Sequence, residues 1–259
     1  MATQKRTALI TGATAGLGKE FARQLAAMGY QLVLVARNQD ALAATAAALS
    51  EEYGVDTQWV AADLSDPAAP RKVFDETQAR GIQVDYLVNN AGIAGPNLLE
   101  EDDWSQQQAF FQLMMLSIAE LCHLFVPPMQ QRGFGWVINV ASVAGRIARA
   151  GGCNYGPTKA WVIALSEELA LSVGKDGVNV SALCPGFTHT EFHERAGLTD
   201  MKNNMPGWMW YDAETVVREG IAAAERGKSV FVSGRLYRWI DPLFQSVWTR
   251  RFFSVSDGR

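Results

Sequence analysis

Short apolar runs alternate with amphipathic stretches along almost the whole chain, and this alternation constrains the fold more than any other feature. The apolar runs are nearly continuous, as expected for strands that are covered on both faces. Strands that alternate with helices favour a parallel sheet with right-handed crossovers. The sequence therefore predicts an α/β fold, with a doubly wound parallel sheet of about seven strands and helices on both faces.

The expected elements follow one another without a linker, an internal repeat or a low-complexity tract. Strands are predicted at 8–11, 31–36, 57–61, 86–89, 136–140, 179–183 and 229–232. Helices are predicted at 18–28, 39–53, 67–79, 105–131, 158–173 and 213–226. A chain of 259 residues suits one large α/β domain. We therefore expect a single domain over residues 1–259.

Three glycines, Gly12, Gly16 and Gly18, lie between the first expected strand and the first expected helix. This context turns a glycine pattern into the prediction of a dinucleotide site. Gly12 permits a tight turn, Gly16 lets the backbone approach a pyrophosphate, and Gly18 lets the helix pack closely on the strand. The first N–H groups of the helix would then face the phosphates. The simpler interpretation, glycines that only end a strand, explains their spacing less well.

A second pattern lies in the middle of the chain. Tyr155 and Lys159 are four residues apart, a spacing that puts both side chains on one face of a helix. A nearby ammonium favours the ionised phenol, so we expect Lys159 to lower the pKa of Tyr155 from its usual value of about 10. Ser142, thirteen residues upstream of Tyr155, follows an expected strand and could hold a substrate oxygen against the phenol. The trio predicts an acid/base device, although a Tyr-x-x-x-Lys pattern alone is weak evidence.

Five motifs in this order resemble a classical short-chain dehydrogenase/reductase over about residues 7–232. They are Thr11-Gly-x-x-x-Gly-x-Gly18, Asn89-Asn-Ala-Gly92, Ser142, Tyr155-x-x-x-Lys159 and Pro185-Gly186. The resemblance implies a Rossmann-like fold and an oxidoreductase that exchanges hydride between a nicotinamide cofactor and a carbonyl or alcohol. It implies three catalytic residues: Ser142, which orients the oxygen, Tyr155, which donates or accepts the proton, and Lys159, which tunes Tyr155 and bonds the cofactor ribose.

The resemblance also implies the cofactor contacts. They are Gly12, Thr14, Ala15, Gly16, Leu17, Gly18, Arg37, Asp63, Leu64, Asn90, Ala91, Gly92, Tyr155, Lys159, Pro185, Gly186, Thr188 and Thr190. In the family the turn at 185–190 wraps the nicotinamide; an ordinary Pro-Gly turn is the competing interpretation. The second strand ends without the acidic residue that would bond the ribose 2′-hydroxyl of NAD, and Arg37 follows it. A guanidinium suits a 2′-phosphate, so NADP(H) is favoured over NAD(H). Arg37 as a solvated turn residue, and Asp63 as a cap of the following helix, are the competing interpretations.

One position departs from the family pattern. The family usually carries an asparagine in the long central helix, and counting back from Pro127 places Met114 there. In the family this asparagine holds a water that passes protons to the lysine, whereas methionine is only a weak acceptor. Either the relay is rebuilt, or activity is impaired, or the matching position lies elsewhere. Met114 is therefore not counted among the catalytic residues.

The interval 189–212 corresponds to the substrate lid of the family. Its large apolar side chains suit a bulky apolar ligand or pack the lid onto its own domain or a neighbouring subunit. They are Phe192, Leu198, Met201, Met205, Trp208, Met209, Trp210 and Tyr211. Gly151, Gly152 and Cys153 would leave room near Tyr155. We expect NADPH-dependent reduction of a hydrophobic ketone or aldehyde, or the reverse reaction. His189 and His193 show no metal-binding pattern, and no metal is predicted.

The segment 235–259 forms an aromatic and basic extension. It reads as a subunit interface of a homodimer or homotetramer, which is favoured, or as a membrane-surface helix. Two alternative functions follow: a catalytically weak NADP-binding protein of the same fold, and a peripheral membrane enzyme acting on lipid-like ketones. The net charge of −4 gives no reason to expect nucleic acid.

The remaining sequence features bear on the compartment. The three cysteines lie far apart, so reduced thiols are expected rather than a disulfide framework. No signal peptide is recognised, and no uninterrupted apolar stretch reaches the length of a membrane span. We therefore expect a cytoplasmic protein.

Overall fold

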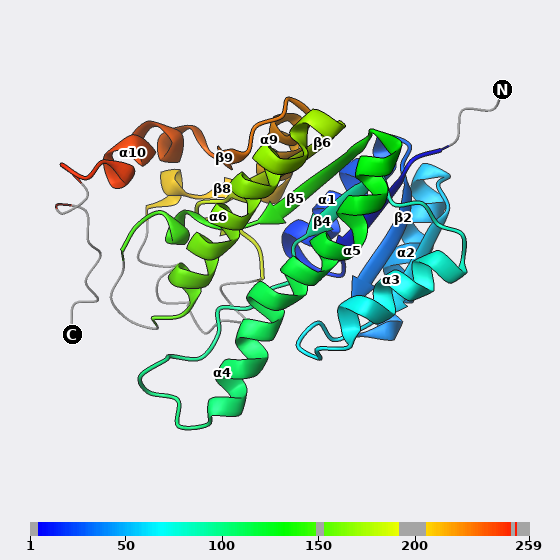
Figure 1. Cartoon of the computed structure of the whole chain (residues 1–259), viewed down its shortest axis with the longest axis horizontal. Coiled ribbons are helices and arrows are strands. Elements are labelled where there is room, and N and C mark those ends of the chain that lie inside the picture. The colour runs from blue at the N-terminus through cyan, green and yellow to red at the C-terminus, as the bar shows by residue number, and fades with distance from the viewer. Residues whose placement is uncertain (1–4, 149–152, 192–205, 250–251, 253–259) are drawn as a thin grey trace.

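Seven parallel strands form one sheet in the order β3-β2-β1-β4-β5-β6-β9. The computed structural model describes residues 5–148, 153–191, 206–249 and 252. The strands of this sheet are β1 (Thr7–Thr11), β2 (Gln31–Ala36), β3 (Thr57–Ala61), β4 (Tyr86–Asn89), β5 (Gly135–Val140), β6 (Val178–Cys184) and β9 (Val230–Val232). Helices flank the sheet (Figure 1). The predicted doubly wound, Rossmann-like α/β fold is confirmed.

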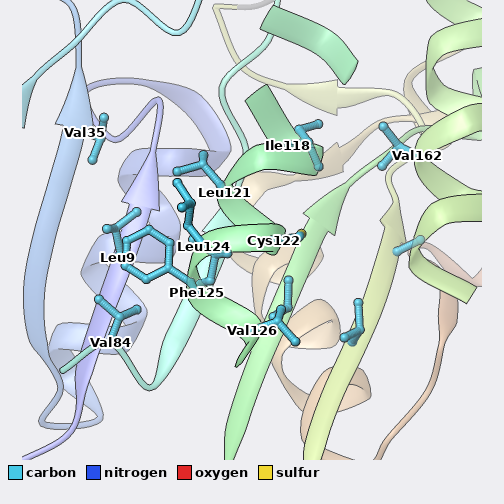
Figure 2. Close-up of a cluster of buried hydrophobic side chains, with 14 of the residues drawn as sticks. Leu9, Val35, Val84, Ile118, Leu121, Cys122, Leu124, Phe125, Val126 and Val162 are labelled. Atoms are coloured by element: carbon cyan, nitrogen blue, oxygen red, sulfur yellow. The ribbon is translucent and has the colours of Figure 1, made fainter. Parts of the chain in front are cut away.

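Helices cover both faces because successive strand residues point to opposite sides. The flanking helices are α1 (Gly16–Ala27), α2 (Gln39–Tyr53), α3 (Ala69–Ala79), α5 (Ser117–Arg132), α6 (Tyr155–Val173) and α9 (Ala213–Glu225). Leu9 of β1 belongs to one buried cluster with side chains of α3, α5 and α6. Its neighbours Ala8 and Ile10 belong to a second cluster with side chains of α1, α2 and α9. Figure 2 shows the first cluster, in which Leu121 and Phe125 of α5 point towards Leu9.

The predicted strands and helices match the observed ones to within three residues at their ends. The main difference lies in the long central helix. Its first part is α4 (Trp104–Phe111), which passes through a π-helical segment, η1 (Gln112–Leu116), into α5. The helix also continues past Pro127 and Pro128, and it ends at Gly133, whose φ of +69° is the left-handed conformation that glycine adopts readily.

The segment Trp104–Arg132 is long and apolar enough to cross a membrane by length and composition, with a mean hydropathy of 1.7 over its most apolar window. From the sequence, no uninterrupted apolar stretch of membrane-spanning length was predicted. Within the fold, 56% of that window is buried. Ile118, Leu121 and Phe125 pack onto the sheet, as in a core helix (Figure 2). A buried core helix passes the same test, so the segment is weak evidence for a membrane span.

Several short elements after β5 lie outside the predicted pattern. Two of them, β7 (Thr188–His189) and β8 (Tyr211–Asp212), pair in parallel and join the two ends of the predicted lid. The 3-10 turns are η2 (Val143–Gly145), η3 (Gly174–Asp176) and η4 (Gly207–Met209). The last helix, α10 (Arg235–Gln245), lies at the end of the molecule opposite α2 and α3 (Figure 1).

Candidate active site

The predicted site residues gather at one edge of the sheet because every strand is parallel and each candidate follows a strand's carboxyl end. Gly12 follows β1, Arg37 follows β2, Asp63 follows β3, Asn90 follows β4, Ser142 follows β5 and Pro185 follows β6. The chain order reverses between the neighbouring strands β1 and β4. In open α/β sheets ligands bind outside the carboxyl ends of the strands at such a switch point.

The glycine turn after β1 is held tightly against the end of β4. A Cβ atom on Gly18 would lie 2.1 Å from the carbonyl oxygen of Gly12, so only glycine fits there. Gly12 itself has a φ of +66°. The Asn90 side chain donates to the carbonyl oxygen of Thr11 at 2.9 Å, and the Thr11 hydroxyl accepts the backbone N–H of Asn90 and of Ala91. The Asn90 amide therefore holds the glycine turn against the end of β4.

The start of α1 fits a phosphate group. Ala15 is the residue before this helix, and it provides no side-chain acceptor for the first N–H groups. The first turn also contains no acidic residue. Uncapped N–H groups at the positive end of a helix bind anions. Gly16 faces Thr190, since a Cβ atom on Gly16 would lie 3.4 Å from the Cβ atom of Thr190, so predicted cofactor contacts from distant parts of the sequence come together.

The other residues of this turn that were predicted as cofactor contacts are Thr14 and Leu17. Each is partly exposed at the start of α1. Their backbone therefore borders the same surface as the uncapped N–H groups.

Arg37 and Asp63 lie side by side after β2 and β3. Nη1 of Arg37 is 3.8 Å from Oδ2 of Asp63, and the two side chains are 72% and 44% exposed. An exposed guanidinium in this position is available to a 2′-phosphate. Asp63 does not cap the next helix, because α3 begins after Ala68; it accepts hydrogen bonds from the backbone and hydroxyl of Ser65 instead. Leu64 is buried in the core, so a cofactor contact there would fall to its backbone.

The trio Ser142, Tyr155 and Lys159 is brought together at the end of β5. Ser142 precedes η2, and its hydroxyl oxygen accepts the N–H of Ala144 at 3.1 Å. A side-chain hydrogen bond joins Ser142 to Tyr155, the first residue of α6. One turn further along α6, the Lys159 ammonium lies 5.6 Å from the centre of the Tyr155 ring. It donates to the carbonyl oxygen of Val140 at 2.7 Å.

Burial dominates the protonation of the trio. It raises the pKa of Tyr155 to about 12, although the hydrogen bond from Ser142 opposes the rise. The expectation that Lys159 lowers this pKa is therefore wrong for the protein by itself, since burial disfavours the phenolate and Lys159, whose own pKa is lowered to about 8, has lost its charge before the phenol titrates. Burial also lowers the pKa of Lys159 to about 8, and this residue is 4% exposed. At neutral pH the phenol holds its proton and can act as an acid.

Met114 lies beside the Asn-Asn-Ala-Gly motif. It is buried within the π-helical segment η1, and its sulfur accepts the N–H of Ile93 at 3.4 Å. The same sulfur would lie 3.1 Å from a Cβ atom on Gly92. Met114 thus packs against the end of the Asn-Asn-Ala-Gly motif.

The predicted nicotinamide loop, from Pro185 to Thr190, is braced from the C-terminal side. A Cβ atom on Gly186 would lie 2.1 Å from the ring of Tyr237 in α10. The Tyr237 hydroxyl accepts the N–H of Phe187 and donates to the carbonyl oxygen of Met209. Thr188 is buried, and its hydroxyl donates to the carbonyl oxygen of Gly186.

The described residues of the predicted lid include both buried and exposed side chains. Trp210 is 8% exposed and its ring lies 5.1 Å from that of His189, whereas Trp208 is 67% exposed. Trp210 therefore packs inward, as one interpretation expected, and Trp208 is exposed. Phe192, His193, Leu198, Met201 and Met205 lie outside the described residues, as do Gly151 and Gly152. Cys153 is exposed, and Cys122 and Cys184 are buried.

Sequence reasoning missed Tyr237, Arg146 and Asp241 among the residues that shape the site, and it quoted Thr11 only as the start of the glycine motif. The position of Thr11 immediately before Gly12 was a usable signal. Arg146 and Asp241 form an ion pair across 95 residues, and neither belongs to a recognisable motif. Only the folded chain brings them together.

A sequence model of the family described as short chain dehydrogenase matches residues 6–200. Among known proteins, the 3-oxoacyl-acyl-carrier-protein reductase FabG of Escherichia coli (strain K12) is 31% identical over 202 residues. That alignment covers 74% of this chain and 80% of the relative.

Solved structures show the same architecture. A short-chain dehydrogenase from Sphingobium yanoikuyae in complex with NADPH superposes with a TM-score of 0.79 at 31% identity, covering 90% of this chain and 91% of that one. A bulky-bulky ketone specific alcohol dehydrogenase from Comamonas testosteroni gives a TM-score of 0.77 at 28% identity, covering 93% and 91%.

Proposed function

Because this chain belongs to the short chain dehydrogenase family, we propose that it is an NADP(H)-dependent reductase of bulky, apolar ketones or aldehydes. One observation carries the proposal. A protonated phenol, a serine hydroxyl and a buried ammonium meet at the same edge of the sheet as a glycine turn that fits a pyrophosphate.

The chain supplies the proton chemistry, and NADPH, when bound, supplies the hydride. Tyr155 donates its proton to the carbonyl oxygen in the reducing direction and accepts it in the reverse direction. Ser142 orients that oxygen, and Lys159 bonds the cofactor ribose. General acid catalysis of this kind contributes roughly 10²–10⁴-fold to the rate. The raised pKa of Tyr155 keeps the phenol protonated at neutral pH, which is the state that the reducing direction requires.

Three observations support the cofactor and the substrate class. The exposed Arg37 after β2 suits the 2′-phosphate that distinguishes NADP from NAD. A structural relative was solved with NADPH, and another is described as specific for bulky-bulky ketones. Trp208 and Met209 of the predicted lid offer aromatic and thioether surface to an apolar ligand.

The test is NADPH oxidation, followed by absorbance, over a panel of aromatic, aliphatic, steroid and acyl ketones. We expect turnover with bulky apolar members of the panel. Tyr155→Phe should abolish turnover and leave NADPH binding nearly intact, because it removes only the proton donor.

Tyr53→Phe is the matched control, since Tyr53 ends α2 and lies at the opposite edge of the sheet from the site. It should leave turnover unchanged. Undiminished turnover in Tyr155→Phe would refute the assigned role of the phenol, and a wild-type protein inactive on the whole panel would refute the reductase proposal.

A further inference from the structure

Helix α10 lies outside the segment that the family model matches, yet it reaches back to the loop that carries Ser142. The guanidinium of Arg146, four residues after Ser142, donates to both carboxylate oxygens of Asp241 in α10, with 2.7 Å between Nη2 and Oδ2. The side chain of Gln245, at the end of α10, donates to the carbonyl oxygen of Arg146 at 2.7 Å. Helix α10 therefore holds the Ser142 loop at two points, the side chain of Arg146 and the backbone carbonyl of Arg146.

The ion pair between Arg146 and Asp241 differs from an ordinary surface pair. The two side chains are only 15% and 17% exposed. Bidentate pairing with a carboxylate fixes direction as well as distance, and partial burial protects the pair from screening by salt. Surface pairs contribute little, but a pair of this geometry and burial can fix a loop.

The loop that this pair anchors is packed tightly against the catalytic helix. A Cβ atom on Gly145 would lie 2.6 Å from the backbone of Lys159 and Ala160 in α6. The N–H of Val143 donates to the carbonyl oxygen of Pro185 at 3.0 Å. Ser142 thus begins a turn wedged between α6, the predicted nicotinamide loop and α10. Displacement of the turn would move the Ser142 hydroxyl relative to Tyr155.

The same helix also braces the predicted nicotinamide loop. Tyr237, one turn before Asp241, packs on Gly186 and accepts the N–H of Phe187. One rigid element therefore contacts both loops that border the candidate reaction centre. A helix placed in this way can set their separation.

We propose that Asp241 and Arg146 are a positioning pair, through which α10 holds Ser142 in register with Tyr155. Neither residue needs to touch the substrate or the cofactor. The proposal rests on the proposed reductase function for its kinetic consequence, while its structural consequence can be measured without turnover.

The kinetic test compares Asp241→Ala, Arg146→Met and the double variant with wild type, using NADPH and the best ketone of the panel. Misplacement of a catalytic group by about 1 Å can cost on the order of 100-fold in rate. We expect kcat to fall about 10- to 100-fold, with the KM for NADPH nearly unchanged. The double variant should be no worse than either single variant, because both remove the same interaction. Asp241→Asn, which keeps one acceptor oxygen, should lose less.

Glu219→Ala is the matched control. The Glu219 carboxylate holds the same helix by accepting from Arg238 at 2.8 Å and from the N–H of Gly234, and none of its hydrogen bonds among the described residues reaches the Ser142 loop. The thermal stability of this Glu219 variant should fall like that of Asp241→Ala, and its kcat should stay unchanged. If kcat fell equally in the two variants, any weakening of the attachment of α10 would disturb catalysis, and the Arg146–Asp241 pair would have no role of its own. That result would overturn the proposal.

Hydrogen exchange gives the readout that is independent of activity. In Asp241→Ala the amides of residues 143–146 should lose protection, whereas in Glu219→Ala they should keep it. Unchanged protection in Asp241→Ala refutes the positioning pair even if the wild type proves inactive on every ketone. Lost protection with an unchanged kcat in an active enzyme refutes it as well.

Discussion

The buried ammonium of Lys159 makes the protein less stable than its packing alone would allow. Burial lowers the pKa of Lys159 from its ordinary value of 10.5 to about 8. Each pKa unit corresponds to about 1.4 kcal/mol, so holding the charged form inside the fold at pH 7 costs about 3 kcal/mol. Lys159→Met removes this cost while it keeps an unbranched side chain in the same space.

The substitution also has a cost. The carbonyl oxygen of Val140 loses the ammonium that donates to it at 2.7 Å, and an unsatisfied buried acceptor costs about 1–3 kcal/mol. At pH 7 we therefore expect Lys159→Met to be more stable than wild type by about 0–2 kcal/mol. Turnover should be lost.

The pH dependence is the sharper measure. Because the folded-state pKa of Lys159 is the lower one, the unfolded chain holds more protons between about pH 8 and about pH 10.5. Wild-type stability should therefore gain from this group as pH rises through that window. By pH 9.5 the burial cost shrinks to about 1 kcal/mol, so the advantage of Lys159→Met over wild type should fall by about 2 kcal/mol between pH 7 and pH 9.5.

Urea unfolding of both proteins at the two pH values measures this difference. Comparing the two proteins at each pH cancels the titration of every group that they share. Lys175→Met, at an exposed position just after α6, controls for the loss of one positive charge. An advantage of Lys159→Met that stays constant or grows with pH would refute the reasoning.

Two further predictions concern the cofactor and the proton path. Arg37→Asp should raise the KM for NADPH roughly 10- to 100-fold, because a hydrogen bond to a charged group is lost, and it should change the KM for NADH far less. Equal changes in the two KM values would show that Arg37 does not select between the cofactors. Arg226→Asp, at the far end of α9, is the control. If methionine breaks the proton relay, Met114→Asn should raise kcat roughly 10-fold, because an amide oxygen is a far better acceptor than a thioether. An unchanged kcat would show that this position does not limit the reaction.

Local patterns in the sequence predicted the framework of the site. The glycine spacing and the apolar run before it are local, so they placed the turn at the end of β1 without knowledge of the rest of the chain. Parallel pairing then put Gly12, Arg37 and Ser142 at one sheet edge, because all strands point the same way. The i, i+4 spacing of Tyr155 and Lys159 required only a helix.

The protonation states and the supports of that site depended on tertiary structure. Whether Lys159 or burial governs the pKa of Tyr155 depends on how much water the surrounding chain removes, and no local pattern carries that quantity. The partnership of Arg146 with Asp241 likewise spans 95 residues. The sequence by itself determined the order of the strands and helices and the identity of the chemical groups. The folded chain decided how deeply those groups are buried and which distant side chains hold them, because desolvation and long-range contacts exist only once the layers have packed.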